Sequence, residues 1–335
     1  MNLSQGDTLG KYSVLEFLGA GAFGKVYLMH DNLLNRDVAV KFVENQNPTS
    51  FVAHFEAQIL HQCRNERIVA INSVDVVQDS AGRYYAAIEM EYIDGGSAQD
   101  LIESGYVTIR RAIRILIDVL FALEHAHRQG ILHRDVKPAN FMLQGNQAKL
   151  SDFGLATTAA TSLTASGAGS PVYCAPEVIN DNITNAQTDV FSAGMSLFQL
   201  ANNIGNLGAR VPSIDTIKLG RVIKTIGYED YVPRRLRYVC NKACAATPDR
   251  RYSNVFEMRQ ALERLRVKQD WSQISPELWR ATVKGQNHEM AIENANPFEM
   301  VYRINGRRRN ANCRAAKDVA SAAKASEEWV YKSTF

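Results

Sequence analysis

Alternating apolar and polar positions dominate the first part of the chain. Two short runs, Tyr12 to Leu18 and Val26 to Met29, alternate with a period of two residues and enclose a glycine-rich stretch. This pattern predicts two strands joined as a hairpin. Further along, apolar residues recur at helical spacing from Thr108 to Arg128, and the segment from Val190 to Leu200 is apolar nearly all round. These features predict two buried helices and an α+β fold that begins with strands and continues with helices.

Another helix is predicted from about Thr49 to Cys63. Its apolar residues Phe51, Phe55 and Ile59 have the spacing of one face that packs on a sheet. Glu56 lies among them, and two interpretations of it stay open at this point. It is either a carboxylate that pairs with a buried lysine or an ordinary solvated residue.

The segment with the most specific chemistry is His133-Arg134-Asp135-Val136-Lys137-Pro138-Ala139-Asn140, followed by Asp152-Phe153-Gly154. It places two carboxylates, a lysine and a carboxamide at the spacing of a phosphoryl-transfer site. One carboxylate must orient and deprotonate an attacking hydroxyl, while the other, with the carboxamide, must hold Mg²⁺ against a triphosphate. Because the two cannot sit at one point, two successive loops supply them.

Two upstream motifs have the composition of a phosphate-binding region. The first is Gly19-Ala20-Gly21-Ala22-Phe23-Gly24-Lys25-Val26, which fits the pattern G-x-G-x-x-G-x-V. Glycine lacks a Cβ atom and therefore lets backbone N–H groups approach phosphate oxygens. The pattern is weak alone, but it lies between two predicted strands, whereas the glycine turn of a dinucleotide-binding fold opens a helix. The second motif, Val38-Ala39-Val40-Lys41, predicts a strand that carries a phosphate-binding ammonium.

With these motifs, residues 11 to 266 resemble the eukaryotic-like, or Hanks-type, serine/threonine protein kinases, a family that also occurs in bacteria. Three more segments carry the resemblance, namely Gly169-Ser170-Pro171-Val172-Tyr173-Cys174-Ala175-Pro176-Glu177, Asp189-Val190-Phe191-Ser192-Ala193-Gly194 and Arg251. The first is similar to the G-T-P-x-Y-x-A-P-E end of the activation segment, with serine for threonine. The second matches D-x-W-S-x-G with phenylalanine for tryptophan, and Arg251 matches the arginine that pairs with Glu177 in the family.

The resemblance implies a two-lobe protein kinase fold. It places a small β-rich N-lobe at residues 11–93 and a larger helical C-lobe at residues 94–266, followed by a C-terminal appendage at residues 267–335. It also implies a phosphotransferase that uses ATP and Mg²⁺, with Mn²⁺ as an alternative ion. A lysine two residues after the catalytic aspartate is typical of serine/threonine kinases, so serine or threonine of a protein is the expected acceptor. The competing interpretation is a pseudokinase or binding regulator that keeps the fold without transfer, and the intact motif residues argue against it.

The family's residue roles carry over to the matching positions. Asp135 is implied to be the catalytic base and Lys137 to neutralise charge on the transferred phosphoryl group. Asn140 and Asp152 are implied to ligate the metal ion. The implied ATP-binding residues are Leu18, Gly19, Gly21, Phe23, Gly24, Val26, Ala39, Lys41, Glu56, Met90, Glu91, Ile93 and Met142.

Within that set, the adenine site is implied to surround a hinge that starts at Met90, the gatekeeper. The backbone of Glu91 and Ile93 is implied to hydrogen-bond adenine, and three apolar side chains are implied to sandwich the ring. These three are Val26, Ala39 and Met142. Ordinary core packing is the alternative role for them, and the two roles are compatible.

Between Gly154 and Gly169 the chain is almost devoid of charge and rich in hydroxyl groups. A phosphate in this segment adds about −1.5 to −2 charge, and Arg134 is the nearest motif-defined cation to receive it. We therefore expect activation by phosphorylation, including autophosphorylation, although incidental serines and threonines are the alternative. The candidate sites are Thr157, Thr158, Thr161, Ser162, Thr164 and Ser166.

Residues 267–335 lie outside the resemblance and hold the whole excess of positive charge. They contain 11 Lys/Arg and 8 Asp/Glu, whereas residues 1–266 contain 27 of each. The predicted elements are a strand from Glu299 to Ile304, an Asn305-Gly306 turn and an alanine-rich helix from about Ala311 to Glu328. The clustered arginines are Arg303, Arg307, Arg308, Arg309 and Arg314. This basic tail is a candidate for contact with a partner or nucleic acid, and a solvated surface is the alternative.

Length and composition agree with this interpretation. A chain of 335 residues with 46% hydrophobic residues can form a two-lobe core of roughly 250 residues. No run approaches the roughly 18 apolar residues that cross a bilayer, and the first residues lack the features of a signal peptide. The five cysteines are scattered, and Cys240 and Cys244 are expected to pack in the core rather than bind a metal. We therefore expect a cytoplasmic protein.

Overall fold

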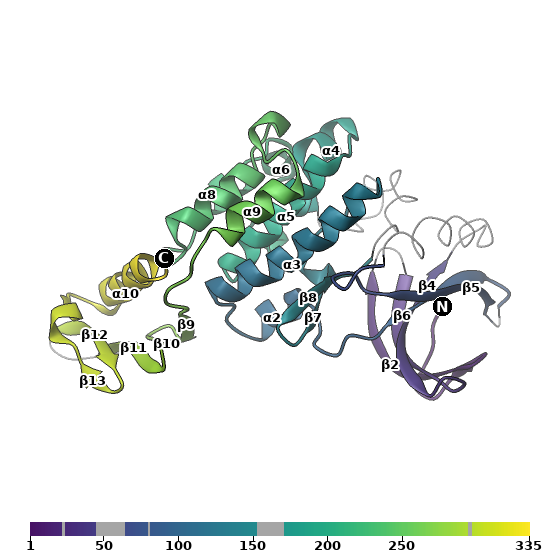
Figure 1. Ribbon diagram of the computed structural model, residues 1–335, viewed down its shortest axis with the longest axis horizontal. Coiled ribbons are helices and arrows are strands. Elements are labelled where there is room, and N and C mark those ends of the chain that lie inside the picture. The colour runs from purple at the N-terminus through teal and green to yellow at the C-terminus, as the bar shows by residue number, and fades with distance from the viewer. Residues whose placement is uncertain (22–23, 45–63, 80, 153–170, 294–296) are drawn as a thin grey trace.

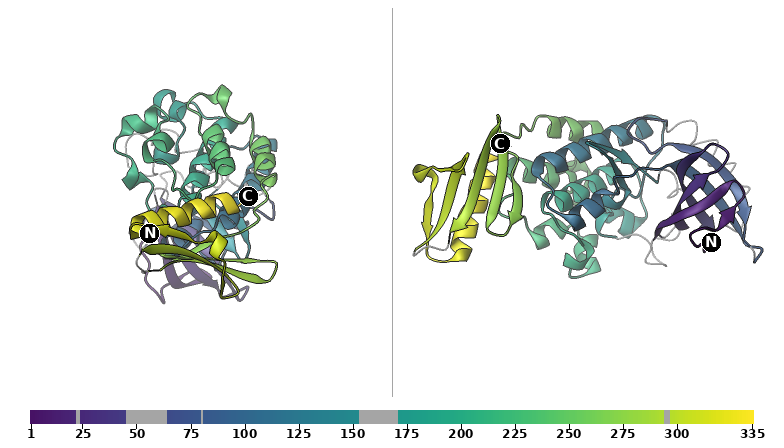
Figure 2. Two further views of the ribbon diagram at one scale, coloured as in Figure 1. Left: turned by 90° about the vertical axis from the view of Figure 1, so that its left-hand side faces the viewer. Right: turned by 90° about the horizontal axis from the view of Figure 1, so that it is seen from below.

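The chain folds into three parts that lie in a row (Figures 1 and 2). The structure, a computed structural model, describes residues 1–21, 24–44, 64–79, 81–152, 171–293 and 297–335. A sheet of strands comes first, a body of helices follows, and a second sheet with one helix ends the chain. The second sheet lies at the end of the helical body that is farthest from the first sheet (Figure 2).

The N-terminal sheet has six strands in the order β1-β2-β3-β4-β6-β5, and all neighbouring pairs are antiparallel. The strands are β1 Thr8–Leu9, β2 Tyr12–Gly21, β3 Gly24–Asp31, β4 Arg36–Glu44, β5 Ile71–Gln78 and β6 Tyr84–Glu91. Strands β2 and β3 pair from Tyr12↔Asp31 to Gly21↔Gly24, which confirms the predicted hairpin. One face of this sheet encloses a small core of its own, built around Tyr27, Val40 and Phe42.

The helical body is organised around two long helices. Helix α3, Ile109–Arg128, begins after Thr108, whose side chain caps it by accepting a hydrogen bond from Arg111 N. Helix α5, Ala186–Ala201, is buried at every position from Thr188 to Ala201. Both predicted helices are therefore confirmed to within a few residues.

Shorter elements complete this body. The helices are α2 Ala98–Ser104, α4 Pro176–Asp181, α6 Ile214–Lys218, α7 Val222–Ile226, α8 Arg234–Ala243 and α9 Val255–Glu263. A two-stranded ribbon of β7, Phe141–Gln144, and β8, Gln147–Leu150, lies beside α3. Cys240 and Cys244 are buried in the core, and the Cys244 thiol donates a weak hydrogen bond to Phe191 O at 3.6 Å. None of the described helices combines the length and apolar character needed to span a bilayer.

The C-terminal unit is a sheet in the order β13-β12-β11-β10-β9, with β14 also paired to β12. Its elements are β9 Ser272–Ser275, β10 Leu278–Val283, β11 Gln286–Glu293, β12 Phe298–Ile304, β13 Arg307–Arg308, β14 Arg314–Ala316 and helix α10 Val319–Ser333. The predicted strand corresponds to β12. The predicted turn is confirmed, because Asn305 and Gly306 have φ values of 48° and 75° and join β12 to β13.

The predicted helix of the tail is wrong over its first part. Residues Arg314–Ala316 form a strand that pairs with β12, and α10 starts only at Val319. Asp318 sets this start, since its carboxylate accepts a hydrogen bond from Ser321 N at 2.7 Å. Helix α10 also continues to Ser333, beyond the predicted end.

Aromatic packing and one carboxylate attach the C-terminal unit to the helical body. The Trp279 ring, 1% exposed, lies 5.4 Å from the Tyr106 ring and 5.3 Å from the Tyr231 ring. Asp270 accepts hydrogen bonds from the Thr108 hydroxyl at 2.9 Å and from Arg110 N at 3.0 Å. A single apolar core runs through both parts.

Several predicted residues lie outside the described part of the chain. They are Phe23, Glu56 with its predicted helix, and the candidate phosphorylation sites Thr157, Thr158, Thr161, Ser162, Thr164 and Ser166.

Candidate active site

Asp135 lies on the loop between α3 and β7, and two neighbouring side chains hold its carboxylate. Lys137 Nζ lies 2.8 Å from Asp135 Oδ2, and Asn140 Nδ2 donates to the same oxygen at 3.1 Å. Asn140 Nδ2 also donates to the Asp135 carbonyl at 2.7 Å. A turn of 3₁₀ helix at Pro138–Asn140 brings these groups together. Three of the predicted site residues therefore form one cluster.

A buried aspartate on α5 fixes the start of this loop. Asp189 accepts hydrogen bonds from the backbone N–H groups of His133, at 3.0 Å, and Arg134, at 2.9 Å. Its Oδ2 also lies 2.8 Å from His127 Nε2 at the end of α3. Burial by itself raises the pKa of Asp189, but the bonds from His127 and His133 outweigh it and leave the pKa below its usual value. The sequence motif contained Asp189, but its partners were not predicted.

Asp152 lies two residues after the end of β8 and pairs with Lys41 of β4. Lys41 Nζ lies 3.0 Å from Asp152 Oδ1, and the lysine is almost completely buried. Ser151 ties the two loops together, because its N–H donates to Asn140 O at 2.9 Å and its carbonyl accepts from His133 Nε2 at 2.8 Å. The two carboxylates thus come from successive loops, as predicted, and the structure adds the hydrogen bonds that join these loops.

The oxygen atoms of Asn140 and Asp152 suit a hard divalent cation. Because the Asn140 amide uses its nitrogen for Asp135, its Oδ1 is the atom that remains for a ligand. Asp152 engages Lys41 through Oδ1, and its second carboxylate oxygen is a further donor. Mg²⁺ and Mn²⁺ both prefer such carboxylate and carbonyl oxygens. The residues present therefore fit the implied ion.

The strand register places the predicted adenine-site residues side by side. On the N-terminal sheet, Val26 pairs with Lys41, and Ala39 pairs with Met90. Met142 comes from β7, and its backbone forms a bridge with Ser97 at the start of α2. Apolar side chains from both lobes therefore border the segment between β6 and α2.

Glu91, at the end of β6, has partners that the sequence did not reveal. Lys149 Nζ lies 2.8 Å from each of its carboxylate oxygens, and Ala70 N donates to Oε1 at 2.8 Å. The Glu91 N–H donates to Ala70 O at 2.9 Å. No sequence signal marks Lys149, because it is one polar residue of a short alternating strand.

Two glycines of the phosphate-binding motif have different structural roles. Gly24 has φ of 136°, and a Cβ atom there would lie 2.0 Å from Phe42 O on β4. Among the described atoms, a Cβ atom on Gly19 would meet nothing within 4 Å. The fold therefore requires glycine at position 24, while the space beside Gly19 is open. Leu18, which directly precedes the motif, is 40% exposed.

Glu177 and Arg251 form the ion pair that the resemblance implied. Arg251 donates to both carboxylate oxygens, at 2.6 and 2.8 Å, and its side chain is buried. It also donates to the carbonyls of Ala245 and Ala246. This bidentate pair joins α4, which ends the activation segment, to the loop before α9.

A sheet lobe, a helical lobe and two carboxylates that each pair with a lysine define the protein kinase class. The family described as "Protein kinase domain" matches residues 12–264, and the chain belongs to this family.

The relatives of this chain are bacterial serine/threonine kinases. The chain is 34% identical over 270 residues to "Serine/threonine-protein kinase PknB" of Mycolicibacterium smegmatis, covering 76% of this chain and 43% of that protein. It is 33% identical over 275 residues to "Probable serine/threonine-protein kinase SCO3848" of Streptomyces coelicolor, covering 76% and 40%. The chain therefore spans less than half the length of these relatives.

Among solved structures, the chain is similar to the PknI kinase domain of Mycobacterium tuberculosis. The TM-score is 0.57 at 23% sequence identity, covering 78% of this chain and 98% of that domain. At this identity the likeness shows the fold alone, which is the two-lobe kinase fold.

Proposed function

We propose that this chain transfers the γ-phosphoryl group of ATP to serine or threonine of protein substrates. The observation that carries the proposal is the Asp135 carboxylate, held by Lys137 and Asn140 and tied through Ser151 to Asp152. The relatives named above are serine/threonine-protein kinases, which supports the choice of acceptor. We assign residues 11–93 and 94–266 to its two lobes.

Each group has a distinct part in this proposal. Asp135 orients the acceptor hydroxyl and takes its proton, while Lys137, on the same loop, neutralises charge on the transferred group. Lys41, held by Asp152, positions the phosphates. Asn140 and Asp152 would hold Mg²⁺, which supplies positive charge against the phosphate oxygens. Apolar residues of both lobes, including Ala39 and Met142, bind the adenine ring.

The alternative is a pseudokinase that binds nucleotide or a partner without transfer. Phosphoryl transfer by the wild-type protein, together with its loss in the variant Asp135→Asn, distinguishes the two interpretations. We expect this variant to reduce kcat by a factor on the order of 10² to 10⁴, since a positioned general base contributes about that much. The measurement is ³²P transfer from ATP to a generic protein acceptor.

Nucleotide affinity and thermal melting serve as controls for this variant. Asparagine has nearly the same volume as aspartate and still accepts a hydrogen bond from Asn140 or Lys137. The nucleotide affinity and the melting temperature should therefore stay close to the wild-type values. Asp152→Ala should also abolish transfer, since it removes a metal ligand. No turnover in the wild-type protein would support the alternative, whereas wild-type turnover in Asp135→Asn would place the catalytic base at another residue.

We also propose that phosphorylation between Thr157 and Ser166 activates the enzyme. Arg134 supports this, because its Nε is buried without a hydrogen-bond partner among the described residues. Phosphatase treatment should then lower activity, and mass spectrometry of active protein should find phosphate in this segment. Full activity without any modification there would contradict the proposal.

We propose a cytoplasmic location, which fits the free thiols of Cys174, Cys240, Cys244 and Cys313. Cell fractionation tests it. Any partner of the basic tail would be additional to the proposed activity, since the described tail contributes no residue to the site.

A further inference from the structure

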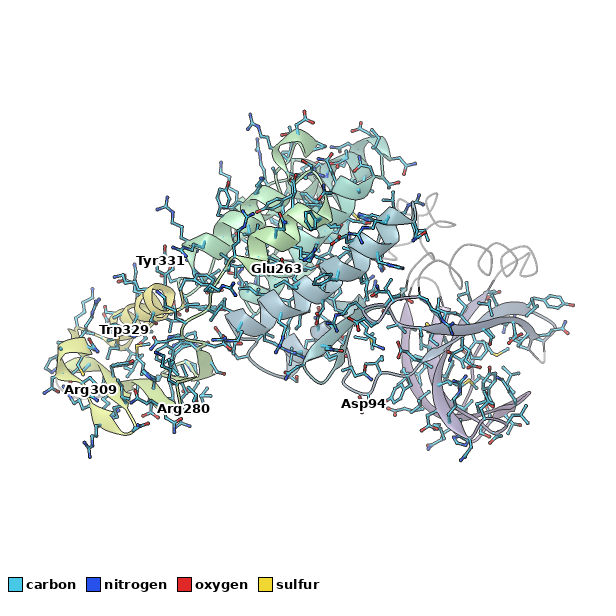
Figure 3. All side chains as sticks on the ribbon, viewed as in Figure 1. Asp94, Glu263, Arg280, Arg309, Trp329 and Tyr331 are labelled. Atoms are coloured by element: carbon cyan, nitrogen blue, oxygen red, sulfur yellow. The ribbon has the colours of Figure 1, made fainter. Side chains whose placement is uncertain are left out.

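The far end of the C-terminal unit carries a row of unpaired arginines. Figure 3 shows Arg309 at this end, remote from the N-terminal sheet. We call the segment from Arg307 to Lys317 the basic edge. It contains five cations and no carboxylate, and all five cations are exposed.

Neighbouring cations of the same sheet are neutralised, and this makes the basic edge distinct. Arg280 Nε lies 3.0 Å from Glu289 Oε2, and Arg303 pairs with Glu293. Arg308, within the edge, lies 2.6 Å from Glu299 Oε1. These ion pairs neutralise the charged side chains on one face of the sheet. That face therefore has little net charge with which to bind a partner.

Three arginines of the basic edge have no such partner. Arg307, Arg309 and Arg314 form no ion pair with any residue in the described ranges. Glu299 is already engaged by Arg308, and the carboxylate of Asp318 caps α10. Of the seven cations of residues 267–335 that form no ion pair in the described ranges, four lie on the basic edge.

The strand register arranges these arginines along a line. Arg307 pairs with Ile304 and Arg314 pairs with Met300, and both partners lie on β12. These two partners are four positions apart on β12, which corresponds to roughly 13 Å along the strand. Because Ile304 and Met300 have the same parity, Arg307 and Arg314 emerge on the same face of the sheet. Arg309 lies between them in the chain, and its N–H donates to Tyr302 O of β12.

We propose that the basic edge binds the phosphate backbone of a nucleic acid. Cations spread along a line match a linear polyanion better than one phosphate group, which needs converging donors. Arginine suits phosphate because its planar guanidinium donates two parallel hydrogen bonds. No aromatic residue occurs between Arg307 and Lys317, so base stacking is not expected and binding should be independent of sequence.

The test is fluorescence anisotropy of a labelled duplex DNA of about 20 base pairs, with the full chain titrated at several salt concentrations. Three phosphate contacts predict that log K falls against log salt with a slope of roughly −2.7. The triple variant Arg307→Ala/Arg309→Ala/Arg314→Ala should weaken binding by at least about tenfold at low salt.

A matched triple variant controls for net charge. Lys268→Ala/Lys284→Asn/Lys324→Ala removes the same charge from exposed positions elsewhere in this unit, and asparagine accommodates the φ of 49° at position 284. This control variant should bind the duplex DNA with an affinity within about twofold of that of the wild type. Equal losses in both triple variants, or no binding at low salt, would overturn the proposal.

Two further measurements distinguish nucleic-acid binding from binding of an acidic protein and from the kinase activity. Polyglutamate at equal charge should compete poorly, and competition as strong as that of DNA would identify an acidic protein as the partner instead. Asp135→Asn should bind DNA like wild type, while the arginine triple variant should keep its phosphoryl transfer. Failure of one proposal therefore leaves the other testable.

Discussion

Two residues of the loops that form the candidate active site adopt backbone conformations that are uncommon for residues with a Cβ atom. Arg134 has φ of 67° and Asp152 has φ of 63°. Such conformations cost roughly 1–3 kcal/mol each and persist only where surrounding contacts determine them. For Arg134 the contact is the bond from its N–H to Asp189, which also holds His133. Asp189 therefore maintains the geometry of the catalytic loop without being placed to touch the substrate.

The variant Asp189→Asn tests this role. The amide keeps one acceptor but turns a donor toward a backbone N–H group, so it loses at least one charge-assisted hydrogen bond. We expect the free energy of unfolding to fall by about 1.5–3 kcal/mol, measured by urea denaturation. Because Arg134 and Asp135 are adjacent, kcat should fall while affinity for ATP changes little. Unchanged stability and turnover would show that the loop holds its shape by other means.

The pH dependence of this effect has a defined sign. The pKa of Asp189 in the folded protein lies below the ordinary value of 3.8. Its contribution to stability is therefore fully present above pH 3.8 and is lost as pH falls through the folded pKa. The stability difference between wild type and Asp189→Asn should be constant near neutral pH and should narrow below about pH 4.

At this scale the sequence identified the chemical groups but not their partners. Fixed spacings marked Asp135, Lys137, Asn140 and Asp152, since loop chemistry requires those residue types in that order. Lys149, which pairs with Glu91, was not predictable, because it comes from a different lobe and one lysine in a four-residue strand carries no pattern.

Among the secondary-structure elements, the hairpin of β2 and β3 contains two motif glycines that the described structure constrains differently. At position 24 a Cβ atom would collide with the backbone of Phe42, and the residue that carries it would have to adopt a φ of 136°. At Gly19 neither constraint exists within the described atoms. The two positions belong to one motif, so only the structure distinguishes them.

Alanine at each position gives a matched pair of variants. Gly24→Ala should lower the free energy of unfolding by about 2 kcal/mol or more, because the β3–β4 pairing must shift. Gly19→Ala should leave stability within about 0.5 kcal/mol, yet raise KM for ATP if its backbone approaches the phosphates. Thermal melting and steady-state kinetics measure the two effects. Equal destabilisation by both variants would contradict this assignment.

The elements of the C-terminal unit show where sequence patterns fail. The run of alanines after Asn310 favours helix by propensity, but residues 314–316 instead pair with β12. Strand β10 was not predicted either, although Trp279 and Ala281 alternate with Arg280 and Thr282 before a Lys284-Gly285 turn. Pairing with β12 decides the first case, and a local pattern does not report it. In the second case β10 pairs with β9 and β11, its neighbours along the chain, so the alternation and the turn were a local signal that the sequence did contain.

At the scale of the whole molecule, the C-terminal unit docks beside the start of α3 rather than hanging free. Asp270 bonds to the cap of α3 through Thr108 and Arg110. Tyr231 connects onward to Asn203, just beyond the end of α5, at 3.2 Å. Helices α3 and α5 also carry His127 and Asp189, which lie at the catalytic loop. The unit therefore contacts the start of α3 directly and is linked to the end of α5 through Tyr231, while the catalytic loop lies at the opposite ends of these two helices.

The variant Trp279→Ala tests whether the unit and the helical body unfold together. Removing this buried ring from between Tyr106 and Tyr231 should cost about 3–5 kcal/mol. Because one apolar core runs through both parts, we expect a single unfolding transition whose Tm falls by roughly 5–10 °C. Ile274→Ala, at a position that is 54% exposed in the same unit, is the control and should change Tm little. A separate early transition in Trp279→Ala, with the remaining transition at the wild-type Tm, would instead make the C-terminal unit an independent domain.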